Sequence, residues 1–317
     1  MTLPRYFISC DWGTSNFRLR LVETENLNVL EEHKTDQGVK TVFDKFLKQD
    51  TLNQNQFFAD YLVKQIQNLP VKHQKHLVVL AGMASSSIGL HELPYTEMPI
   101  TMNGESLLWE NLYLNVVELH LLVISGVKTK TGMMRGEEIQ AIGLEEELKQ
   151  YESGTLILPG THCKHMHYEY GAFTGLRNYM TGELFEVLSS KSILSNSIEN
   201  LGWSTHSEAA FLKGIEVGFA GEWSANLLTV RATQLFGESK KEDNFYYLSG
   251  LLIGDELSYL KGHEGKIFLA ASGEVFRLYK IALEKLIALD NLVCFDSNTL
   301  ERALLIGQKK IILRNEK

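Results

Sequence analysis

The pattern of hydrophobic and polar positions predicts an α/β protein. Residues 17–21 and 164–170 alternate at every second position, which is typical of half-buried strands. Apolar runs predict further strands at residues 6–10, 29–33, 76–81, 119–125, 155–158, 172–179 and 266–271. Apolar residues three or four positions apart predict helices at residues 42–47, 57–62, 136–142, 182–189, 208–220, 225–235 and 275–286, and from residue 298 onward.

The order of these elements predicts two domains. Each half of the chain contains a buried strand, a tight turn and an alternating strand. A chain of 317 residues also exceeds the size at which a single core usually stops growing. We place the boundary after residue 125, which gives domains 1–125 and 126–317. Residues 83–105 lack a clear period, and long irregular segments of this kind are usually functional or disordered.

Composition excludes several classes of protein. With 44% hydrophobic and 22% charged residues, the chain is expected to be globular. Its net charge of -8 argues against broad binding to nucleic acid or to an anionic membrane. The three cysteines lie far apart and predict neither a disulfide framework nor a paired zinc site. There is no signal-peptide pattern and no apolar run long enough to span a bilayer, so we expect a cytoplasmic protein.

Two similar turns, one in each half, carry the functional signal. The first hairpin (residues 12–18) reads Trp-Gly-Thr-Ser-Asn-Phe-Arg, and the second hairpin (residues 159–164) reads Pro-Gly-Thr-His-Cys-Lys. Glycine allows close approach of a ligand, and a hydroxyl with exposed N–H groups suits an anion. Each copy alone is also compatible with an ordinary turn. Together they predict a duplicated phosphate-binding unit with phosphate held between the two lobes.

No P-loop pattern occurs, and no Gly-x-Gly-x-x-Gly pattern follows a strand. A nucleotide would therefore need another architecture. Residues 11–16 resemble the first phosphate motif of the superfamily of actin, hexokinase and the heat-shock chaperone ATPases, and residues 158–164 resemble its second. Narrower matches to the 2-dehydro-3-deoxygalactonokinase family occur, in family order, at residues 36–38, 81–83, 134–138, 179–185 and 248–257.

This resemblance implies two RNase H-like domains of the actin-like ATPase class with a central cleft. It implies a sugar-acid-binding segment in the first domain and a nucleotide-binding side in the second. The implied reaction transfers the γ-phosphate of ATP, with Mg²⁺, to the terminal hydroxyl of 2-dehydro-3-deoxy-D-galactonate in galactonate breakdown. The expected partner is thus a small sugar acid, and a homodimer is compatible with the sequence.

One segment departs from the family pattern. The family has a Gly-Ser-Arg sequence after the residues that match Gly82 and Met83, whereas this chain has Ala-Ser-Ser-Ser at residues 84–87. If that arginine binds the carboxylate of the sugar acid, the contact here is absent or supplied elsewhere. The departure therefore leaves the exact sugar acid open. The candidate substrate-binding residues are Met83, Ser85, Ser86 and Arg135.

Phosphoryl transfer needs charge neutralisation and a base near the attacking hydroxyl. Asp11, at the end of a strand, is the candidate for organising Mg²⁺ through water, or else a turn-forming aspartate. Glu137 is preferred over Glu138 as the base, because acids in related sugar kinases precede a helix shortly before the second hairpin. Both glutamates would also complement a helix N-terminus. Arg135 suits a carboxylate or a phosphoryl group, or is a surface residue.

The remaining candidates bind ATP and its phosphates. They are Gly13, Thr14, Ser15, Asn16, Gly160, Thr161, His162, Lys164, Gly250 and Gly273. Lys164 on an alternating strand is equally compatible with a solvent-facing side chain. Gly250 and Gly273 are compatible with simple helix-entry turns. The histidines near the second hairpin do not have the spacing of a closed zinc site.

Three other functions compete with the leading hypothesis. The first is a kinase for a different sugar or sugar acid, favoured by the departure at residues 84–87. The second is an actin-like ATP-binding protein that phosphorylates no metabolite, against which the acidic residues 137–138 count. The third is an exopolyphosphatase-type hydrolase, which would share both hairpins but need no sugar acceptor.

Overall fold

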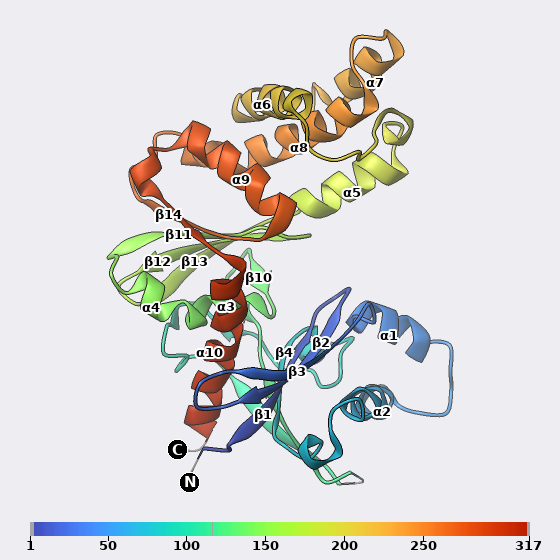
Figure 1. The fold of residues 1–317 in the computed structure, drawn as a ribbon, viewed down its shortest axis with the longest axis vertical. Coiled ribbons are helices and arrows are strands. Elements are labelled where there is room, and N and C mark those ends of the chain that lie inside the picture. The colour runs from blue at the N-terminus through green and yellow to red at the C-terminus, as the bar shows by residue number, and fades with distance from the viewer. Residues whose placement is uncertain (1–2, 116, 316–317) are drawn as a thin grey trace. The chain divides into compact units, whose positions relative to one another are not determined.

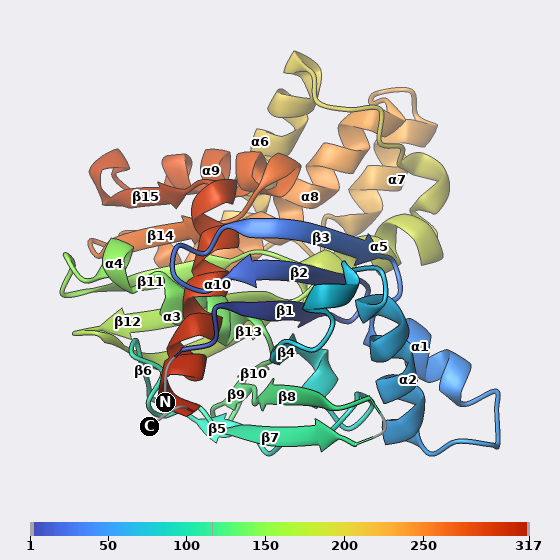
Figure 2. The same ribbon diagram turned by 60° about the horizontal axis from the view of Figure 1, so that its bottom comes forward.

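The computed structural model describes residues 3–115 and 117–315, and its first sheet has six strands in the order β3-β2-β1-β4-β8-β7 (Figure 2). These strands are β1 (Tyr6–Trp12), β2 (Phe17–Glu23), β3 (Val29–Thr35), β4 (Val78–Gly82), β7 (Trp109–Leu114) and β8 (Leu119–Ile124). β1 pairs with β2 in antiparallel and with β4 in parallel, and β4 pairs with β8 in parallel. A small sheet contains β5 (Thr96–Glu97), β9 (Val127–Lys128) and β10 (Met133–Met134).

The second six-stranded sheet has the order β15-β14-β11-β12-β13-β6. Its strands are β6 (Ile100–Thr101), β11 (Ser153–Leu158), β12 (Cys163–Glu169), β13 (Ala172–Tyr179), β14 (Lys266–Ala270) and β15 (Leu292–Phe295). The order β13-β12-β11-β14-β15 repeats the order β3-β2-β1-β4-β8 of the first sheet. In both sheets the central strand is parallel to the fourth strand, and the fourth to the fifth. This repeat confirms the predicted α/β class and the duplication of an RNase H-like sheet.

Contacts divide the chain into two compact units. The first contains residues up to 152, residues 168–176 and residues from 298 onward, and the second contains residues 153–167 and 177–297. The first unit has α1 (Val39–Phe46), α2 (Gln54–Ile66), α3 (Glu137–Gly143), α4 (Glu145–Leu148) and most of α10 (Ser297–Asn315). The second has α5 (Thr181–Lys191), α6 (Thr205–Phe219), α7 (Leu227–Leu235), α8 (Lys241–Leu257) and α9 (Gly273–Leu286). Short 3₁₀ turns cover Val71–His73, Met83–Ser85, Ser195–Ser197, Ser258–Leu260 and Leu289–Asn291.

These units differ from the division at residue 125 expected from the sequence. α3 packs on α10 so closely that a side chain on Gly143 would collide with the backbone of Ala303, and one on Gly307 with the backbone of Ile139. This contact groups α3 and the C-terminal helix with the first sheet. The division into separately folding domains 1–125 and 126–317 stays a prediction, as does the central cleft.

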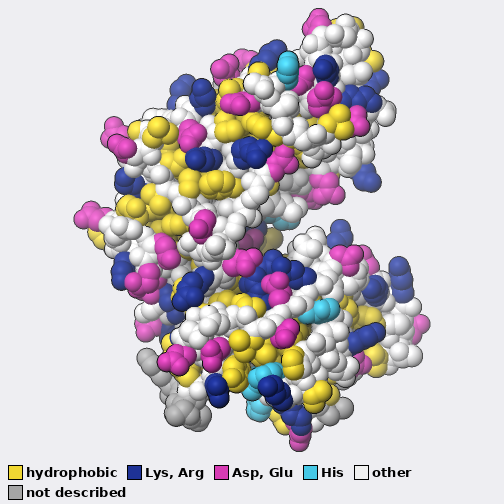
Figure 3. Space-filling view, viewed as in Figure 1, with side chains coloured by type: hydrophobic (Ala, Val, Ile, Leu, Met, Phe, Trp, Pro, Cys, Tyr) yellow, Lys and Arg dark blue, Asp and Glu magenta, His cyan; other side chains and the backbone are white. Residues whose placement is uncertain are grey.

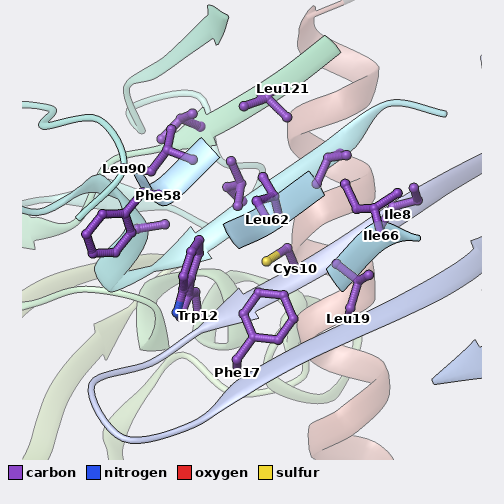
Figure 4. Packing of buried hydrophobic residues seen from close by; sticks show 14 of the residues in the cluster. Ile8, Cys10, Trp12, Phe17, Leu19, Phe58, Leu62, Ile66, Leu90 and Leu121 are labelled. Carbon is purple, nitrogen blue, oxygen red and sulfur yellow. The ribbon is translucent and has the colours of Figure 1, made fainter. Parts of the chain in front are cut away.

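The core of the first unit lies on one face of β1 and β2. Trp12, Phe17 and Phe58 are fully buried, and the ring of Trp12 contacts those of Phe17 and Phe58 (Figure 4). Because side chains alternate across a strand, Asp11 and Arg18, which pair across β1 and β2, lie on the opposite face. The apolar face thus anchors the sheet and leaves the other face for polar residues.

The second unit is built around the contact of α6 with α8, which lie side by side in Figure 1. A side chain on Gly250 would collide with the backbone of Phe211, and one on Gly214 with the backbone of Tyr247. Gly250 therefore lies in the middle of a helix and packs against its neighbour. The alternative that Gly250 lies in a helix-entry turn was wrong, whereas its contact with the nucleotide stays a prediction.

Basic and acidic side chains are interspersed over the face of the molecule shown in Figure 3. None of the described helices is both long enough and apolar enough to cross a bilayer. Among the described residues, the three cysteines are free thiols.

Candidate active site

The first hairpin connects β1 to β2 and presents exposed polar residues. The N–H of Gly13 donates to the carbonyl oxygen of Asn16 at 2.9 Å, which closes the turn. Thr14, Ser15 and Asn16 are exposed. Behind the turn, N–H groups at the start of α1 donate to carbonyl oxygens of the hairpin. The pairs are Gly38 to Ser15 at 3.2 Å, Val39 to Gly13 at 2.9 Å and Lys40 to Thr14 at 3.2 Å. The start of α1 therefore fixes the shape of this hairpin.

The second hairpin is built in a similar way from β11 and β12. Gly160, Thr161 and His162 are exposed. The N–H of Glu183, at the start of α5, donates to the carbonyl oxygen of Thr161 at 3.0 Å. The side chain of Glu183 also lies 2.5 Å from Nε2 of His162. The helix that follows β3 and the helix that follows β13 thus each support a Gly-Thr turn.

Four glycines distinguish the two sides of these hairpins. A side chain on Gly38 would collide with the carbonyl oxygen of Thr14, and a Cβ on Gly182 would lie 2.5 Å from that of Gly160. By contrast, the nearest protein atom to a Cβ on Gly13 would be 3.6 Å away, and the nearest to a Cβ on Gly160 would be 3.8 Å away. Neither Gly13 nor Gly160 has a left-handed φ. Close packing therefore explains why Gly38 and Gly182, behind the hairpins, are glycines. It does not explain Gly13 and Gly160, which have open space beside them.

Asp11 and Glu137 are brought together by two further glycines. Gly82 ends β4 with a φ of 88° and pairs with Trp12. Gly136 precedes α3 with a φ of 117°, and a Cβ on it would lie 3.1 Å from the Cα of Gly82. Only glycine tolerates such angles at so close an approach. The end of β1 and the start of α3 therefore meet at Gly82.

The charges at this meeting point influence one another. The pKa of Asp11 is raised by loss of hydration and also by the nearby carboxylate of Glu137, while Arg18 and Arg20 act in the opposite direction. Arg20 is buried and pairs with Glu32 at 2.7 Å. The polar face of the first sheet thus carries Asp11, Glu32 and the two arginines, and Glu137 and Glu301 lie close to it. The arrangement is suited to handling a charged ligand.

The two adjacent glutamates have different environments. Glu138 is fully buried, and both its carboxyl oxygens accept from the N–H of Gly136 at 2.8 Å. Burial, and next the charge of Glu137, raises the pKa of Glu138 to about 8. Glu137 is partly exposed. The accessible acid is therefore Glu137, the one that the sequence favoured as the base.

Arg135 is buried, so its interpretation as a surface residue was wrong. Its Nη1 donates to the carbonyl oxygen of Ser85 at 2.5 Å and to its hydroxyl oxygen at 2.7 Å, and Nη2 donates to the carbonyl of Leu93 at 3.3 Å. The guanidinium group also lies over the ring of Tyr95, 4.1 Å from its centre. Arg135 thus holds the irregular segment that follows β4.

The other predicted residues are placed as follows. Met83 and Ser86 lie in the same segment as Ser85, and the hydroxyl of Ser86 donates to the carbonyl of Met83 at 2.7 Å. Lys164 is buried on β12, so the alternative of a solvent-facing lysine was wrong. Gly273 starts α9 with a φ of 63° and has open space around it. No described contact joins Gly250 to the other predicted ATP-binding residues.

The residues present fit a magnesium site of the open kind. Among residues 3–115 and 117–315, no group of three or more His, Cys, Asp or Glu side chains is arranged to hold a metal. Mg²⁺ is usually held by one or two carboxylates, with the remaining positions taken by water and substrate phosphates. The neighbouring carboxylates of Asp11 and Glu137 match that pattern.

The repeated sheets, each with a Gly-Thr hairpin supported by a helix, define a protein of the actin-like ATPase fold. The sequence also matches the family described as 2-keto-3-deoxy-galactonokinase over residues 11–304, nearly its whole length. The chain belongs to this family of sugar-acid kinases. The match confirms the family that the motifs indicated.

Individual relatives agree with this assignment. The chain is 28% identical over 293 residues to a probable 2-dehydro-3-deoxygalactonokinase of Rhizobium meliloti strain 1021, with 90% of each chain covered. It is 27% identical over 288 residues to the 2-dehydro-3-deoxygalactonokinase of Escherichia coli K12, covering 88% of this chain and 89% of that one. A crystal structure of a candidate 2-dehydro-3-deoxygalactonokinase from Sinorhizobium meliloti has a TM-score of 0.80 at 26% identity, covering 96% of this chain and 95% of that one.

The sequence did not reveal two features of the site. One is the support of each hairpin by a helix start, although Gly38 and Gly182 lie within segments that matched the family. The other is a buried polar cluster around Glu256 behind the second hairpin. The acidic pair Asp255 and Glu256 at the end of a largely apolar helix is the signal that would have indicated it.

Proposed function

We propose that the chain transfers the γ-phosphate of ATP to the terminal hydroxyl of 2-dehydro-3-deoxy-D-galactonate, releasing ADP. The observation that carries this proposal is the matched construction of the two hairpins. In each hairpin, the N–H groups at the start of a helix hold the turn from behind, and an exposed Gly-Thr pair lies in front. A Cβ added to that glycine would meet no close protein atom. Exposed N–H and hydroxyl groups on a fixed turn are suited to phosphate.

In the first unit, Glu137 accepts the proton of the sugar hydroxyl as its oxygen attacks the γ-phosphorus and the bond to the β-phosphate oxygen breaks. Asp11 would hold Mg²⁺ through water, together with residues 13–16 at the phosphates. When bound, this ion neutralises charge on the phosphate oxygens. The nearness of Asp11 to Glu137 supports these roles, because the charge of Glu137 raises the pKa of Asp11.

The sugar acid is bound by the segment after β4, with Met83 and Ser86 as contacts. Ser85 is fully buried and bonded to Arg135, so both residues shape this segment from behind. The Nε of Arg135 is buried without a hydrogen-bond partner among the described residues. A direct contact of Arg135 with the substrate carboxylate would use that atom.

In the second unit, Gly160, Thr161, His162 and Lys164 contact the phosphates of ATP. Gly273, with its open surroundings at the start of α9, is suited to the adenosine part. Gly250 has a packing role, and a nucleotide contact there would be indirect. Because ATP is a cytoplasmic substrate, we place the reaction in the cytoplasm.

A panel of acceptors tests the proposal. Purified protein is incubated with Mg-ATP and with individual 2-keto-3-deoxy acids or hexoses, and ADP release is followed. We expect release that depends on 2-dehydro-3-deoxy-D-galactonate. If another sugar acid is preferred, that acid is the substrate. ADP release without an acceptor would indicate a hydrolase. Absence of acceptor-dependent release from every sugar acid would refute the proposed function.

A further inference from the structure

Behind the second hairpin, hydrogen bonds from three elements meet at one buried carboxylate. Glu256 lies near the end of α8, and its side chain is 1% exposed. Its Oε1 lies 2.8 Å from Nε2 of His165, on β12. Its Oε2 accepts from the hydroxyl of Tyr279, on α9, at 2.8 Å and from the hydroxyl of Thr181, at the start of α5. A single side chain thus connects α8 to a strand and two helices.

The Tyr279 branch leads to the hairpin itself. The hydroxyl of Tyr279 lies 3.1 Å from Sγ of Cys163, which opens β12. Because the proton of Tyr279 goes to Glu256, the thiol proton serves both the Tyr279 oxygen and the carbonyl oxygen of Gly160, which lies 3.4 Å from the sulfur. Burial raises the pKa of the Cys163 thiol to about 12, so the sulfur keeps its proton and remains a donor. Glu256 is therefore connected through two side chains to the glycine of the hairpin.

The Thr181 branch leads to the helix start that supports the same hairpin. Thr181 immediately precedes Gly182, the residue that must lack a side chain because of the carbonyl of Gly160. The next residue, Glu183, donates its N–H to Thr161 at 3.0 Å. The bond from Thr181 to Glu256 therefore holds the start of α5 in its supporting position.

The His165 branch fixes the strand that leaves the hairpin. His165 follows Lys164 directly and is 2% exposed. Its Nδ1 lies 2.7 Å from the hydroxyl of Tyr259, and its Nε2 faces Glu256. Nε2 donates to the carboxylate, and Nδ1 forms a hydrogen bond with the hydroxyl of Tyr259. The ring is therefore held at both of its nitrogens.

We propose that Glu256 is a positioning residue for the second hairpin, which it holds in the shape that binds the phosphates of ATP. The inference rests on the proposed function, because it takes this hairpin to be a phosphate site. Glu256 is buried and its oxygens are occupied by protein donors, so it acts through the hairpin and not on the substrate. Removing it leaves three buried polar groups without their partner, and the elements that carry them lose their common anchor.

Three variants test this role by isothermal titration with Mg-ATP and by thermal unfolding. Glu256→Ala should weaken ATP binding by about tenfold or more. Glu256→Gln should stay within about threefold, since its amide oxygen still accepts from Thr181 and Tyr279. Its amide NH₂ donates to Nε2 of His165 once the ring carries its proton on Nδ1. The predicted rescue by glutamine identifies hydrogen bonding, not charge, as the means of positioning.

Asn244→Ala is the matched control. Asn244 is also buried on α8 and donates to the carbonyls of Ser197 at 3.0 Å and Val230 at 2.7 Å, away from the hairpin. It should lower the unfolding temperature and leave the Kd for ATP within about twofold. If Glu256→Ala does not fold, Tyr279→Phe removes a single hydroxyl and should weaken ATP binding by about threefold.

The outcomes separate this role from the proposed function. If Glu256→Ala or its substitute Tyr279→Phe binds ATP as the wild type does, or if Asn244→Ala weakens binding equally, the positioning role is wrong. Suppose that the wild type binds ATP, Glu256→Ala or its substitute Tyr279→Phe binds it more weakly as expected, and no acceptor is phosphorylated. The positioning role then stands and the proposed function fails. A wild type that does not bind ATP would refute both.

Discussion

Arg135 donates from one nitrogen, Nη1, to both the carbonyl oxygen and the hydroxyl oxygen of Ser85, at 2.5 Å and 2.7 Å. Ser85 lies in the segment where the sequence departs from the family pattern. The residue expected to contact the sugar acid is therefore bonded to the segment expected to contact it. The shape of the substrate segment depends on this pair.

Replacing Ser85 tests that dependence. Ser85→Ala removes two buried hydrogen bonds, the one accepted from Arg135 and one donated to the carbonyl of Gly82 at 3.3 Å, and should lower the free energy of unfolding by about 1–3 kcal/mol. The KM for the sugar acid should rise while the KM for ATP stays unchanged, because among the described residues the hydrogen bonds of the Ser85 side chain go to Arg135 and Gly82 and not to the first hairpin. Ser87→Ala, at an exposed position of the same segment, is the control and should change neither constant. Equal KM values for the sugar acid in Ser85→Ala and the wild type would contradict the role.

Glu137 and Glu138 form a natural pair of test and control. Glu137→Gln should bind ATP normally and lose turnover by about 10²–10⁴-fold, since the partly exposed acid no longer accepts the hydroxyl proton. Glu138→Gln should keep most of its turnover, because Glu138 is buried and bonded to Gly136. Single-turnover kinetics with saturating ATP measure the chemical step. Near-normal turnover of Glu137→Gln would exclude it as the base.

Glu138 should also make stability depend on pH. Its pKa rises from 4.5 to about 8 in the folded protein, so the folded state holds a proton that the unfolded state releases. This contribution is complete below the unfolded pKa, declines as the pH rises, and is lost once the pH passes the folded pKa. The decline amounts to at most about 1.4 kcal/mol per pH unit.

Denaturant unfolding of the wild type and Glu138→Gln at pH 6 and pH 9 measures this effect. Glutamine resembles the protonated acid and does not titrate, so the variant should gain stability relative to the wild type as the pH rises. Parallel curves for the two proteins would show that Glu138 is ionised throughout this range.

The glycines on the two sides of the hairpins should respond differently to alanine. Gly13→Ala and Gly160→Ala meet no close protein atom, so the unfolding temperature should hardly change. Their Kd for ATP should nevertheless rise by about tenfold or more if phosphate occupies that space. Gly38→Ala and Gly182→Ala collide with backbone oxygens and should cost about 1–3 kcal/mol of stability. Unchanged ATP binding in Gly13→Ala and Gly160→Ala would show that the hairpins are ordinary turns.

Local patterns were sufficient to predict most of the sheets. The apolar runs and alternating strands around both hairpins appear as β1, β2, β11 and β12, because burial on one face determines their period. The edge strand β7 was missed, since its outer side chains are largely exposed and give no apolar run. The packing of α10 on α3 also could not be predicted, because it depends on the approach of Gly143 to Ala303 and of Gly307 to Ile139, residues that are far apart in the sequence.

The candidate site shows the same limit. Gly-Thr motifs and acidic residues next to a helix are local, and the sequence predicted them. The pairing of Arg135 with Ser85 joins residues 50 positions apart, and the bond between His165 and Glu256 joins residues 91 positions apart. Such contacts are decided by the packing of whole elements. For this reason the sequence assigned Gly250, in a family-like segment, to the nucleotide, whereas in the structure Gly250 lies within α8 where that helix packs on α6.

Gly250→Ala distinguishes these two roles of Gly250. An added methyl group would collide with the backbone of Phe211, so α6 and α8 must move apart. We expect a loss of about 1–3 kcal/mol in the free energy of unfolding, because overpacking a close helix contact cannot be relieved by a side-chain rotation. Gly214→Ala, on the facing helix, should cost a similar amount, and the double variant less than the sum, since one separation of the helices relieves both. The Kd for ATP should stay unchanged in all three proteins. A weaker Kd at unchanged stability would instead place Gly250 at the nucleotide.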